Sequence, residues 1–323
     1  MSIYVNDCNK VNDIFINVNG KKKINSMWVN KNGNPTKVFS TGKKIYDFST
    51  ITWADGTDEE IAAMLDAHYA GLIDIHDYWH VGDERVVHLS AINKMYTNES
   101  HKAQDVTMVL MNAGGKTLTE PINGVSECAF IVGQKDCLRD ILFNNRPEGG
   151  YMDSSGLNLF LNTGEDDPKP SLGGWAYCQR YKWCQYMYRT SFPITIRPIF
   201  KKFINVSSDN TLTENGRKNI SNDYFSLFSE KEVFGIVTKG DEISQSEDVW
   251  IEYYKEPSHR IINQIGKEDG TVTLWWLRSI PRNSNSDFCI VNDKGEIGVQ
   301  KSNSDVLLGT RTQYFSLVMF GCI

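Results

Sequence analysis

Apolar and polar residues alternate along the first 40 residues, in a pattern that repeats itself. The segments SIYVNDCNKVND, IFINVNGKKKINS and MWVNKNGNPTKVFS each combine an alternating arm with an Asn-containing turn. Asn19-Gly20 and Asn32-Gly33 are the clear turns, because Asn-Gly adopts the positive φ angles of a tight hairpin. Small hairpins have no stable core of their own. We therefore expect residues 1–50 to form a β-hairpin repeat module for attachment or oligomerisation. A decorative β-meander is the open alternative.

Helical spacing of apolar residues first occurs after Thr57. The spacing predicts a helix over about 58–70, because Thr57 and Glu60 form a capping box and Gly71 suits a left-handed stop.

A second helical stripe is broken by Pro193. Its members share one face at helical spacing: Trp175, Cys178, Tyr181, Cys184 and Tyr188. Shorter helices are predicted over residues 135–145 and within 194–200.

Short apolar runs predict strands around residues 86–89, 107–114 and 127–134. Residues 223–235 are predicted to form a strand and a turn, and the polar stretch 238–248 a surface loop. With helices in the middle and strands at both ends, the pattern predicts an α+β domain that follows the N-terminal module and covers residues 51–323.

Near the C-terminus, a dense apolar run from Leu274 to Leu277 stops at Arg278 and Ser279. A polar, turn-prone tract follows, and apolar residues return at Phe288. We expect Trp275, Trp276 and Leu277 to be buried, with Trp175 in the same or an adjoining core.

The composition is that of a globular protein, with 323 residues, 40% of them hydrophobic and 23% charged. A net charge of −6 gives no reason to expect nucleic acid as a partner. We expect no membrane insertion, because no apolar run approaches the ~20 residues of a spanning helix, and no signal peptide is recognised in MSIYVNDCNK. The seven scattered cysteines include no CxxC pair and predict buried, reduced thiols in a chain made in a reducing cytoplasm.

Motifs that carry chemistry are weak. The stretch His76 to His80 imitates the HExxH zinc signature, but Asp77 replaces the glutamate and the segment looks extended, so ordinary, partly buried histidines are expected. Lys116 follows two glycines without the frame of a phosphate loop. The acidic run 165–167 predicts a solvated loop, with calcium binding as the open alternative. Cysteine–histidine nucleophilic chemistry also stays open. No motif favours an enzyme, a metal site or a cofactor.

Several blocks in chain order carry a resemblance: WADGTDEEIAAMLDAHYAGLIDIHDYWHVGDERVVHLS, SHKAQDVTMVLMNAGG, GGWAYCQRYKWC, DYFSLFSEKEVFG, WWLRS, FCIVNDKGEIG and SLVMFGCI. Together they resemble a phage- and prophage-associated domain of unknown function of the gut Firmicutes type, over about residues 51–323. Its final third is similar to C-type lectin-fold proteins, which include the formylglycine-generating-enzyme-like group and the variable proteins of diversity-generating retroelements.

The resemblance implies a C-type lectin-like domain, with an antiparallel sheet, flanking helices and long loops. In those proteins the WLRS-type strand and the final strands form a frame, and the polar residues between them bind ligand. The implied ligand-binding residues are Arg282, Asn283, Ser284, Asn285, Ser286, Gln300, Lys301, Asn303, Asp305, Arg311, Gln313 and Tyr314.

The implied function is non-catalytic receptor binding by a phage or prophage tail protein. Its expected partners are a bacterial surface protein or glycan and other tail or baseplate proteins. The resemblance implies a homotrimer in the virion, at the tail tip or fibre, synthesised in the host cytoplasm. Glu296, Gln300 and Lys301 do not arise simply from the asparagine codons that such retroelements diversify. Either the chain is not actively diversified or those positions are fixed.

Three other functions stay open. One is a formylglycine-generating-type enzyme or a hydrolase on the same scaffold, although Cys289 and Cys322 lie in apolar strand patterns and are not assigned to an active-site pair. The others are a bacterial adhesin and a structural baseplate protein.

Overall fold

The computed structural model describes residues 14–17, 21–24, 26–31, 34–40, 47–91, 103–136, 175, 179–209, 217–241, 245–263, 272–281, 287–301 and 315–323. Within these residues the fold is α+β, as predicted, with mostly antiparallel sheets and few helices. None of the helices in the described ranges has the length and apolar content to span a bilayer.

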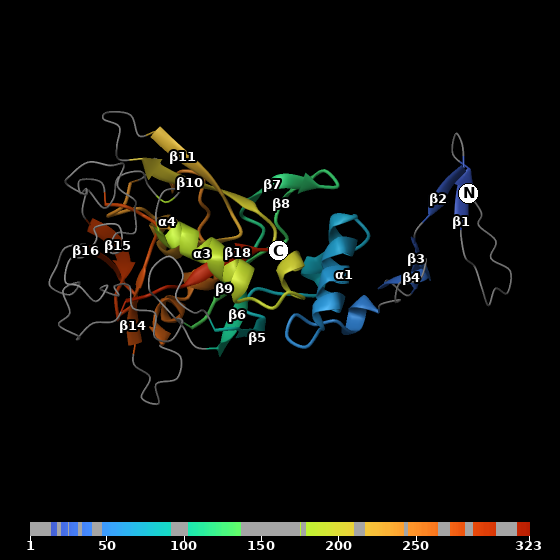
Figure 1. The fold of residues 1–323 in the computed structure, drawn as a ribbon, viewed down its shortest axis with the longest axis horizontal. Helices are drawn as coiled ribbons and strands as arrows, with labels where there is room; N and C mark the ends of the chain where they lie inside the picture. The colour runs from blue at the N-terminus through green and yellow to red at the C-terminus, as the bar shows by residue number, and fades with distance from the viewer. Residues whose placement is uncertain are drawn as a thin grey trace.

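A five-stranded antiparallel sheet forms the centre of the main body, in the order β12-β18-β9-β6-β5 (Figure 1). Its strands are β5 (Glu84–Leu89), β6 (Gln104–Ala113), β9 (Phe130–Gln134), β12 (Phe225–Leu227) and β18 (Met319–Cys322). Every residue of β9 and β18 is buried, so both faces of the sheet are covered there. The predicted strands at 86–89, 107–114 and 127–134 are confirmed as β5, β6 and β9.

Two further sheets pack beside the central one. The first has the order β11-β10-β7-β8 and consists of β7 (Thr117–Ile122), β8 (Val125–Glu127), β10 (Phe203–Asp209) and β11 (Arg217–Asp223). The second has the order β13-β14-β15-β16, with β17 parallel to β14. Its strands are β13 (Ile262–Asn263), β14 (Val272–Trp276), β15 (Asp287–Val291), β16 (Ile297–Lys301) and β17 (Phe315–Ser316).

Helix α1 (Asp58–Tyr69) lies where the sequence predicts, whereas α3 (Gln179–Thr190) ends before Pro193 as predicted but begins at Gln179, after Trp175 of the predicted stripe. Helix α1 has the capping box of Thr57 and Glu60, and Gly71 follows it with φ 67°. Helix α3 packs on β12, where the Gln185 side chain donates to Phe225 O at 2.7 Å. Of the predicted stripe, Trp175 and Cys184 are buried, and Tyr181 and Tyr188 are half-buried; Cys178 lies outside the described residues.

Several local predictions are wrong. Residues 194–200 contain only a 3-10 turn, η4 (Arg197–Ile199), because Pro198 donates no backbone hydrogen bond. The predicted turn within 223–235 is a short helix, α4 (Glu230–Phe234). The histidine segment forms a 3-10 turn, η2 (Ile75–Asp77); His68 and His76 are half-buried as expected, but His80 is exposed. Most of the helix predicted at 135–145 lies outside the described residues.

The tryptophans near the C-terminus are buried, as the apolar run from Leu274 to Leu277 predicts. Trp175, Trp275, Trp276 and Leu277 are each 0% exposed and belong to one continuous core. Trp275 also donates its indole N–H to Arg260 O at 3.0 Å, so its polar atom is satisfied. The remaining 3-10 turns are η1 (Phe48–Thr50), η6 (Glu252–Lys255) and η7 (Pro257–Arg260).

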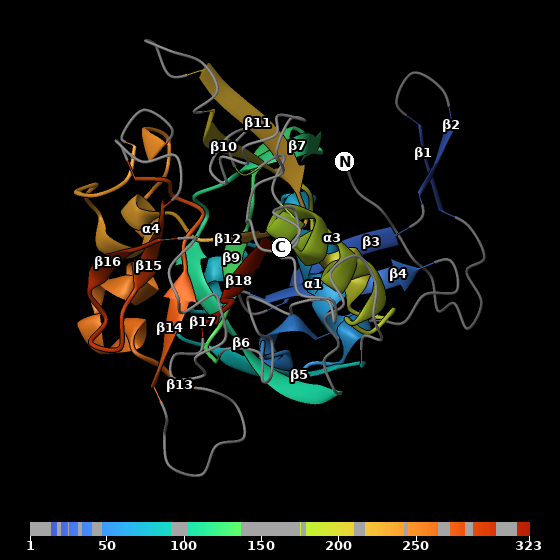
Figure 2. The ribbon, with the colours of Figure 1, turned by 60° about the vertical axis from the view of Figure 1, so that its left-hand side comes forward.

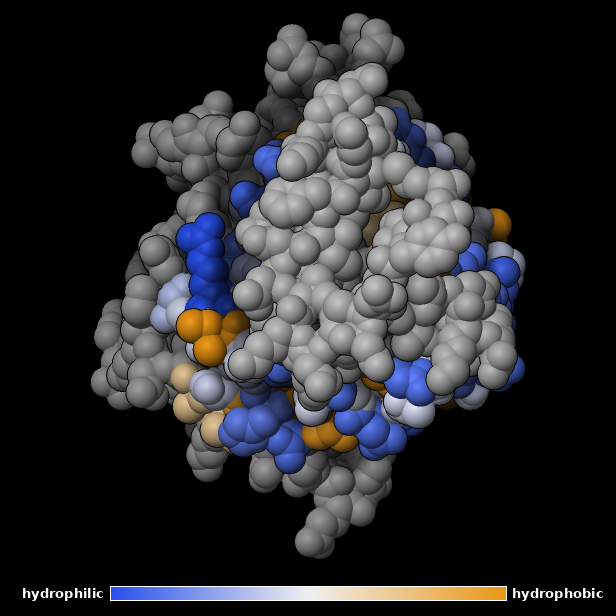
Figure 3. All heavy atoms as spheres, turned by 90° about the vertical axis from the view of Figure 1, so that its right-hand side faces the viewer, coloured by the Kyte–Doolittle hydropathy of each residue, from blue (hydrophilic) through white to orange (hydrophobic). Residues whose placement is uncertain are grey.

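In the view of Figure 3 the described residues that are visible are mostly hydrophilic, with small hydrophobic areas between them. Single exposed apolar residues of this kind are normal on a folded protein.

The N-terminal repeats form two hairpins. Strand β1 (Ile14–Asn17) pairs with β2 (Lys21–Ile24), and β3 (Ser26–Lys31) pairs with β4 (Asn34–Ser40). Figure 1 draws them apart from the three sheets, on the side of α1, and Figure 2 shows the same separation for β1 and β2. The core of the main body begins before residue 50, because Phe48 is 1% exposed. A separate role for the hairpins remains a prediction.

Deletion of the N-terminal hairpins tests whether they are separate from the core of the main body. Removal of residues 1–46 should leave the free energy of unfolding nearly unchanged, whereas removal of residues 1–50 also deletes buried Phe48 and should cost about 3 kcal/mol or more. Urea denaturation of both truncated proteins gives the two values. Light scattering of the protein that lacks residues 1–46 should report fewer subunits per particle than light scattering of the full chain. If the number of subunits is unchanged, the hairpins are not the oligomerisation module.

Candidate functional site: a buried charge network

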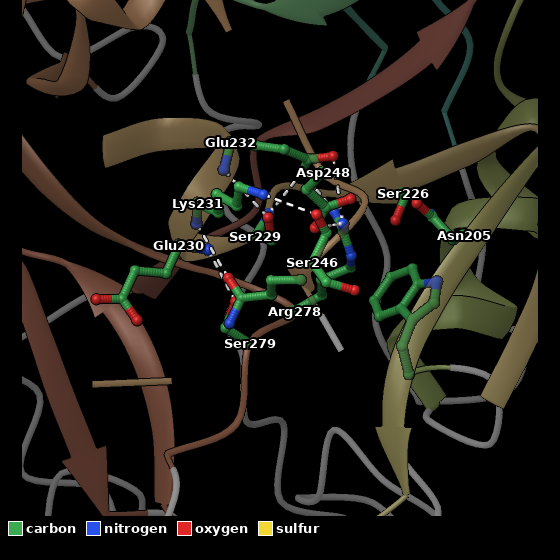
Figure 4. Close-up of polar contacts among 12 residues, drawn as sticks. Asn205, Ser226, Ser229, Glu230, Lys231, Glu232, Ser246, Asp248, Arg278 and Ser279 are labelled. Carbon is green, nitrogen blue, oxygen red and sulfur yellow. Dashed lines mark hydrogen bonds and ion pairs between the residues drawn. The ribbon is translucent and has the colours of Figure 1, made fainter. Parts of the chain in front are cut away.

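Four charged side chains meet in the core: Lys116, Glu232, Asp248 and Arg278. Their side chains are at most 5% exposed. Lys116 Nζ lies 2.6 Å from Glu232 Oε1 and 2.9 Å from Asp248 Oδ1. Arg278 Nη1 lies 2.5 Å from Glu232 Oε2, and Arg278 Nη2 lies 2.5 Å from Asp248 Oδ2. Each carboxylate therefore contacts both cations, and the cluster is neutral as a whole. Figure 4 labels Glu232, Asp248 and Arg278 of this cluster.

The four residues come from distant parts of the chain. Lys116 directly precedes β7, Glu232 lies in α4, Asp248 follows a short turn, and Arg278 comes two residues after β14. Lys116 Nζ also lies 5.7 Å from the centre of the Phe320 ring in β18. The network thus joins all three sheets and α4.

Local hydrogen bonds fix Arg278 and Glu232. The backbone N–H of Arg278 donates to Phe228 O at 2.8 Å, and its guanidinium donates to Leu227 O at 2.9 Å. Ser229 and Glu232 form a capping box at the start of α4, in which Ser229 N donates to Glu232 Oε2 at 2.7 Å. The same carboxylate therefore caps a helix and pairs with two cations.

The cations determine the ionisation of the network. Burial by itself would raise the pKa of Asp248, but Arg278 and Lys116 outweigh burial and lower this pKa to about 2. Burial likewise opposes the charge of Lys116, yet Asp248 and Glu232 raise its pKa above the ordinary value. A buried network of this kind is charged because every member has a partner.

A branch of the network reaches Trp175. Lys116 Nζ donates to Asn205 Oδ1 at 3.1 Å, and Asn205 Nδ2 donates to Asp223 Oδ2 at 2.6 Å. Trp175 Nε1 donates to the same Asp223 oxygen at 2.7 Å. Burial raises the pKa of Asp223, while hydrogen bonds that include those from Asn205 and Trp175 act in the opposite direction.

A second buried carboxylate, Glu230, binds the backbone of the following segment. It accepts hydrogen bonds from Thr238 N at 2.7 Å, Lys239 N at 3.0 Å and Gly240 N at 2.6 Å. A Cβ at position 240 would lie 2.9 Å from Glu230 Oε2, so this close approach requires glycine. The prediction that 238–248 is a surface loop is right only in part. Thr238, Lys239, Ser246 and Glu247 are exposed, whereas Gly240, Gln245 and Asp248 are buried.

The Glu230 segment holds the start of the first polar tract. Glu230 N donates to Ser279 Oγ at 2.8 Å, Asp241 N donates to Ile280 O at 2.9 Å, and Gly240 forms a β-bridge with Pro281. Pro281 is the last described residue before 282–286. The described residues that lead into this tract are therefore fixed by buried hydrogen bonds.

The structure places few of the predicted ligand-binding residues. Gln300 and Lys301 are the last two residues of β16. The others lie outside the described residues: Arg282, Asn283, Ser284, Asn285, Ser286, Asn303, Asp305, Arg311, Gln313 and Tyr314. The described residues that bound the two tracts are adjacent, because Asp287 pairs with Lys301 across β15 and β16.

The sequence prediction missed the charge network. In the sequence, Lys116 suggests only a phosphate loop, whose frame is absent, and Asp248 belongs to the polar stretch 238–248, which predicts a surface loop. The one local signal was the Ser229-x-x-Glu232 capping box, which identifies α4 but not the partners of Glu232.

The cysteines of the described residues fit the predicted buried, reduced thiols. Cys128, Cys184, Cys289 and Cys322 are buried and unbridged. Burial raises the pKa values of Cys289 and Cys322 well above the ordinary value, which disfavours the reactive thiolate form. The described residues contain no group of three or more histidine, cysteine, aspartate or glutamate side chains that could hold a metal ion.

The geometry of the network is suited to a structural role. Its charged atoms are directed at one another within the core, and their hydrogen bonds extend to the segments that precede residue 282. The charge network can therefore fix the position of the described residues that lead into the first polar tract.

Replacing Arg278 should show how strongly the network constrains the fold. Arg278→Met leaves two buried carboxylates facing Lys116 alone and should cost about 3–5 kcal/mol of unfolding free energy in urea. Lys135→Met is the matched control, because Lys135 and Glu84 form an exposed pair at 2.6 Å, with side chains 45% and 41% exposed. The control should cost at most about 1 kcal/mol. Equal losses would show that the buried network has no special importance.

Acid should weaken the contribution of Asp248. Because its pKa is lowered from 3.8 to about 2, the stabilisation is complete above pH 3.8 and is lost as the pH falls through about 2. The loss corresponds to about 2 kcal/mol. Urea denaturation of the wild type and Asp248→Asn should therefore give a stability difference that narrows between pH 4 and pH 2. A difference independent of pH would contradict the assigned ionisation.

Comparison with known proteins gives one match. Residues 155–309 match the family described as Domain of unknown function (DUF6273), which is slightly less than half of the chain. The matched segment includes Glu232, Asp248 and Arg278, whereas Lys116 lies before it. No curated protein and no solved structure matches the chain.

Proposed function

We propose that this protein binds a ligand on a bacterial cell surface, without catalysis, as the receptor-binding protein of a phage or prophage tail. The ligand is a surface protein or glycan, bound by the polar tracts at residues 282–286 and 300–314. The proposed place of action is the tail tip or fibre of the virion, after synthesis in the host cytoplasm.

The observation that carries the proposal is the pairing of Asp287 with Lys301. Asp287 is the first described residue after one tract, and Lys301 is the last described residue at the start of the other. Two polar segments, separated in sequence, therefore have neighbouring anchors on one sheet. Loops carried by a rigid sheet are a common place for binding residues, since their side chains can change at little cost in stability.

The buried frame supports the same proposal. Trp275 and Trp276 are fully buried in β14, and the residues that follow are held by the charge network and by Glu230. We propose that this frame is C-type lectin-like and that retroelement diversification, if it acts on this chain, acts on the polar tracts. The buried residues of the frame would then determine the stability of the fold, whereas the residues of the polar tracts would determine which ligand is bound.

A non-catalytic role also agrees with the buried titratable groups. The charge network is directed inward, and the thiols of Cys289 and Cys322 are buried with raised pKa values. An enzyme of the formylglycine-generating type would need an accessible, reactive cysteine. These observations favour binding over that alternative.

We further propose that the N-terminal hairpins join the protein to tail or baseplate components and assemble it as a homotrimer. In Figure 1 the hairpin β1–β2 and the strands β14 to β16 lie at opposite ends of the long axis. Attachment at one end would leave the other end free for ligand. Three copies would raise the avidity of individually weak sites.

The test is a binding assay with labelled protein on a panel of gut Firmicutes cells and their purified surface polysaccharides. The double variant Arg311→Ala and Tyr314→Ala should reduce binding at least about tenfold, because arginine and tyrosine are frequent interface anchors. Its melting temperature should stay nearly unchanged, since exposed substitutions cost within about 0.5 kcal/mol.

The control variant is Arg189→Ala, which removes an exposed arginine from α3, away from the two tracts in sequence. It should bind like the wild type. Binding that survives the double variant, and also survives Arg282→Ala with Lys301→Ala, would locate the ligand site elsewhere. A wild-type protein that binds no member of the panel would count against the proposed function.

A further inference from the structure

Lys116 and Asn205 face each other in the core, where β7 and β10 pair. Phe203 of β10 is paired with Leu118 of β7 in an antiparallel register. Continuing this register by two residues places Asn205 opposite Lys116. Lys116 Nζ donates to Asn205 Oδ1 at 3.1 Å, and the two residues are 6% and 0% exposed. A primary amine therefore lies beside the carbonyl group of an amide, away from bulk water.

The amide of Asn205 is held in one orientation. Its Nδ2 donates to Asp223 Oδ2 at 2.6 Å, and the same carboxylate oxygen accepts a hydrogen bond from Trp175 Nε1 at 2.7 Å. Asp223 and Trp175 are each 0% exposed. The amide nitrogen is thus directed at Asp223, which leaves the carbonyl group on the side of Lys116.

Two carboxylates lie beside the amine. Lys116 Nζ is 2.6 Å from Glu232 Oε1 and 2.9 Å from Asp248 Oδ1. A carboxylate at such a distance can take a proton directly from the amine nitrogen. Burial favours the free amine, but Asp248 and Glu232 outweigh burial and raise the pKa of Lys116. The amine is therefore charged most of the time, and its reaction with a neighbouring group is slow.

We propose that Lys116 and Asn205 form an isopeptide bond in the folded protein, with Glu232 as the base that accepts a proton from Lys116. A lysine amine is a nucleophile, and a carboxamide offers a carbonyl carbon to attack. One reaction in the lifetime of the chain is sufficient, so close positioning can compensate for the low abundance of the free amine. The proposal concerns the chain itself and does not depend on the proposed function.

The chemical step exchanges one amide for another. One proton passes from the Lys116 ammonium to Glu232, and the lone pair of the free amine forms a bond to Asn205 Cγ. The bond between Cγ and Nδ2 then breaks. A second proton moves from Nζ to the departing nitrogen, which leaves as ammonia, and Nζ keeps its third proton as an amide N–H. The proton on Glu232 compensates for the lost charge of Lys116, so the cluster stays neutral.

The surroundings favour formation of the bond. The centre of the Phe320 ring lies 5.7 Å from Lys116 Nζ, and Phe203 packs on Phe320 with ring centres 5.2 Å apart. These apolar walls exclude the water that would hydrolyse the amide, and ammonia that reaches the solvent is diluted there. The bond would join positions that are 89 residues apart. A crosslink of this kind restricts the unfolded chain, as a disulfide does.

Mass spectrometry of the purified full chain tests the proposal. After incubation for several days below the melting temperature, we expect a fraction of the protein to have lost the mass of one ammonia molecule. Proteolysis and fragment-ion mapping should then give one branched peptide, in which Lys116 Nζ is joined to Asn205 Cγ. Denaturing gel electrophoresis should show a second, faster band, because an internal crosslink makes the unfolded chain more compact.

Variants separate the roles of the residues. Lys116→Met and Asn205→Leu should each lose the branched peptide. Glu232→Gln keeps the shape of the side chain but removes the base, so the rate of bond formation should fall at least about a hundredfold. Lys202→Met is the matched control, because Lys202 is an exposed lysine just before β10, with Nζ 5.3 Å from the centre of the Tyr224 ring. This control should crosslink like the wild type.

Circular dichroism shows which variants are folded, and the peptide map of the wild type is decisive even where a variant is not. Four outcomes would overturn the inference. In the first, Lys116 and Asn205 of the incubated wild type are recovered only in unlinked, unmodified peptides. In the second, the loss of ammonia is located in a cyclic imide, and no branched peptide is found. In the third, folded Lys116→Met loses ammonia to the same extent as the wild type. In the fourth, folded Glu232→Gln crosslinks at the wild-type rate.

Discussion

The arrangement of the three sheets depends on a buried network of two cations and two carboxylates. Each of the four charged side chains lies within 3 Å of two side chains of opposite charge. The network thereby connects Lys116, which precedes β7, with Arg278, which follows β14. Removing such charges from water is costly, so an ion network adds less net stability than its short distances suggest. An incomplete network, however, leaves a buried charge without a partner. The native arrangement is therefore favoured over alternatives that leave any of the four segments out of place.

The constraint extends from the network to the surface. Glu232 belongs to α4, and its neighbour Glu230 binds the backbone of residues 238–240. That segment in turn pairs with Pro281, and Asp287 pairs with Lys301. A chain of hydrogen bonds thus connects the charged core with the anchors of the polar tracts. Each step uses a buried carboxylate or a backbone pair, and both kinds of contact tolerate little displacement.

The buried frame around β14 and the polar tracts differ in how strongly packing restricts their side chains. In the frame, Trp275 and Trp276 are fully buried, and a change of volume there opens a cavity or forces neighbours apart. Val299 in β16 is 40% exposed, so a substitution at this position should cost little stability. A protein that must alter what it binds can do so on such exposed positions while the buried charges and tryptophans keep the fold. Binding and stability then involve separate sets of residues.

The sequence by itself determined the features that depend on neighbouring residues. Thr57 and Glu60 predicted the start of α1, the Asn-Gly pairs predicted the N-terminal hairpins, and the apolar run ending at Leu277 predicted a buried strand. These signals are local because a cap, a tight turn or an alternating strand involves only a few consecutive residues. The same signals gave the α+β class. The division near residue 50 stays a prediction, and the burial of Phe48 became visible only in the tertiary packing.

Tertiary structure alone decided which polar residues are buried. Lys116, Asp248 and Arg278 resemble solvated charges in sequence, because an unpaired charge belongs in water. Their burial is favourable only when all partners converge, and these partners lie 30 residues apart for Arg278 and Asp248 and 132 residues apart for Lys116 and Asp248. Contacts between distant residues leave no periodic pattern in the chain, so the charge network became visible only in the folded structure.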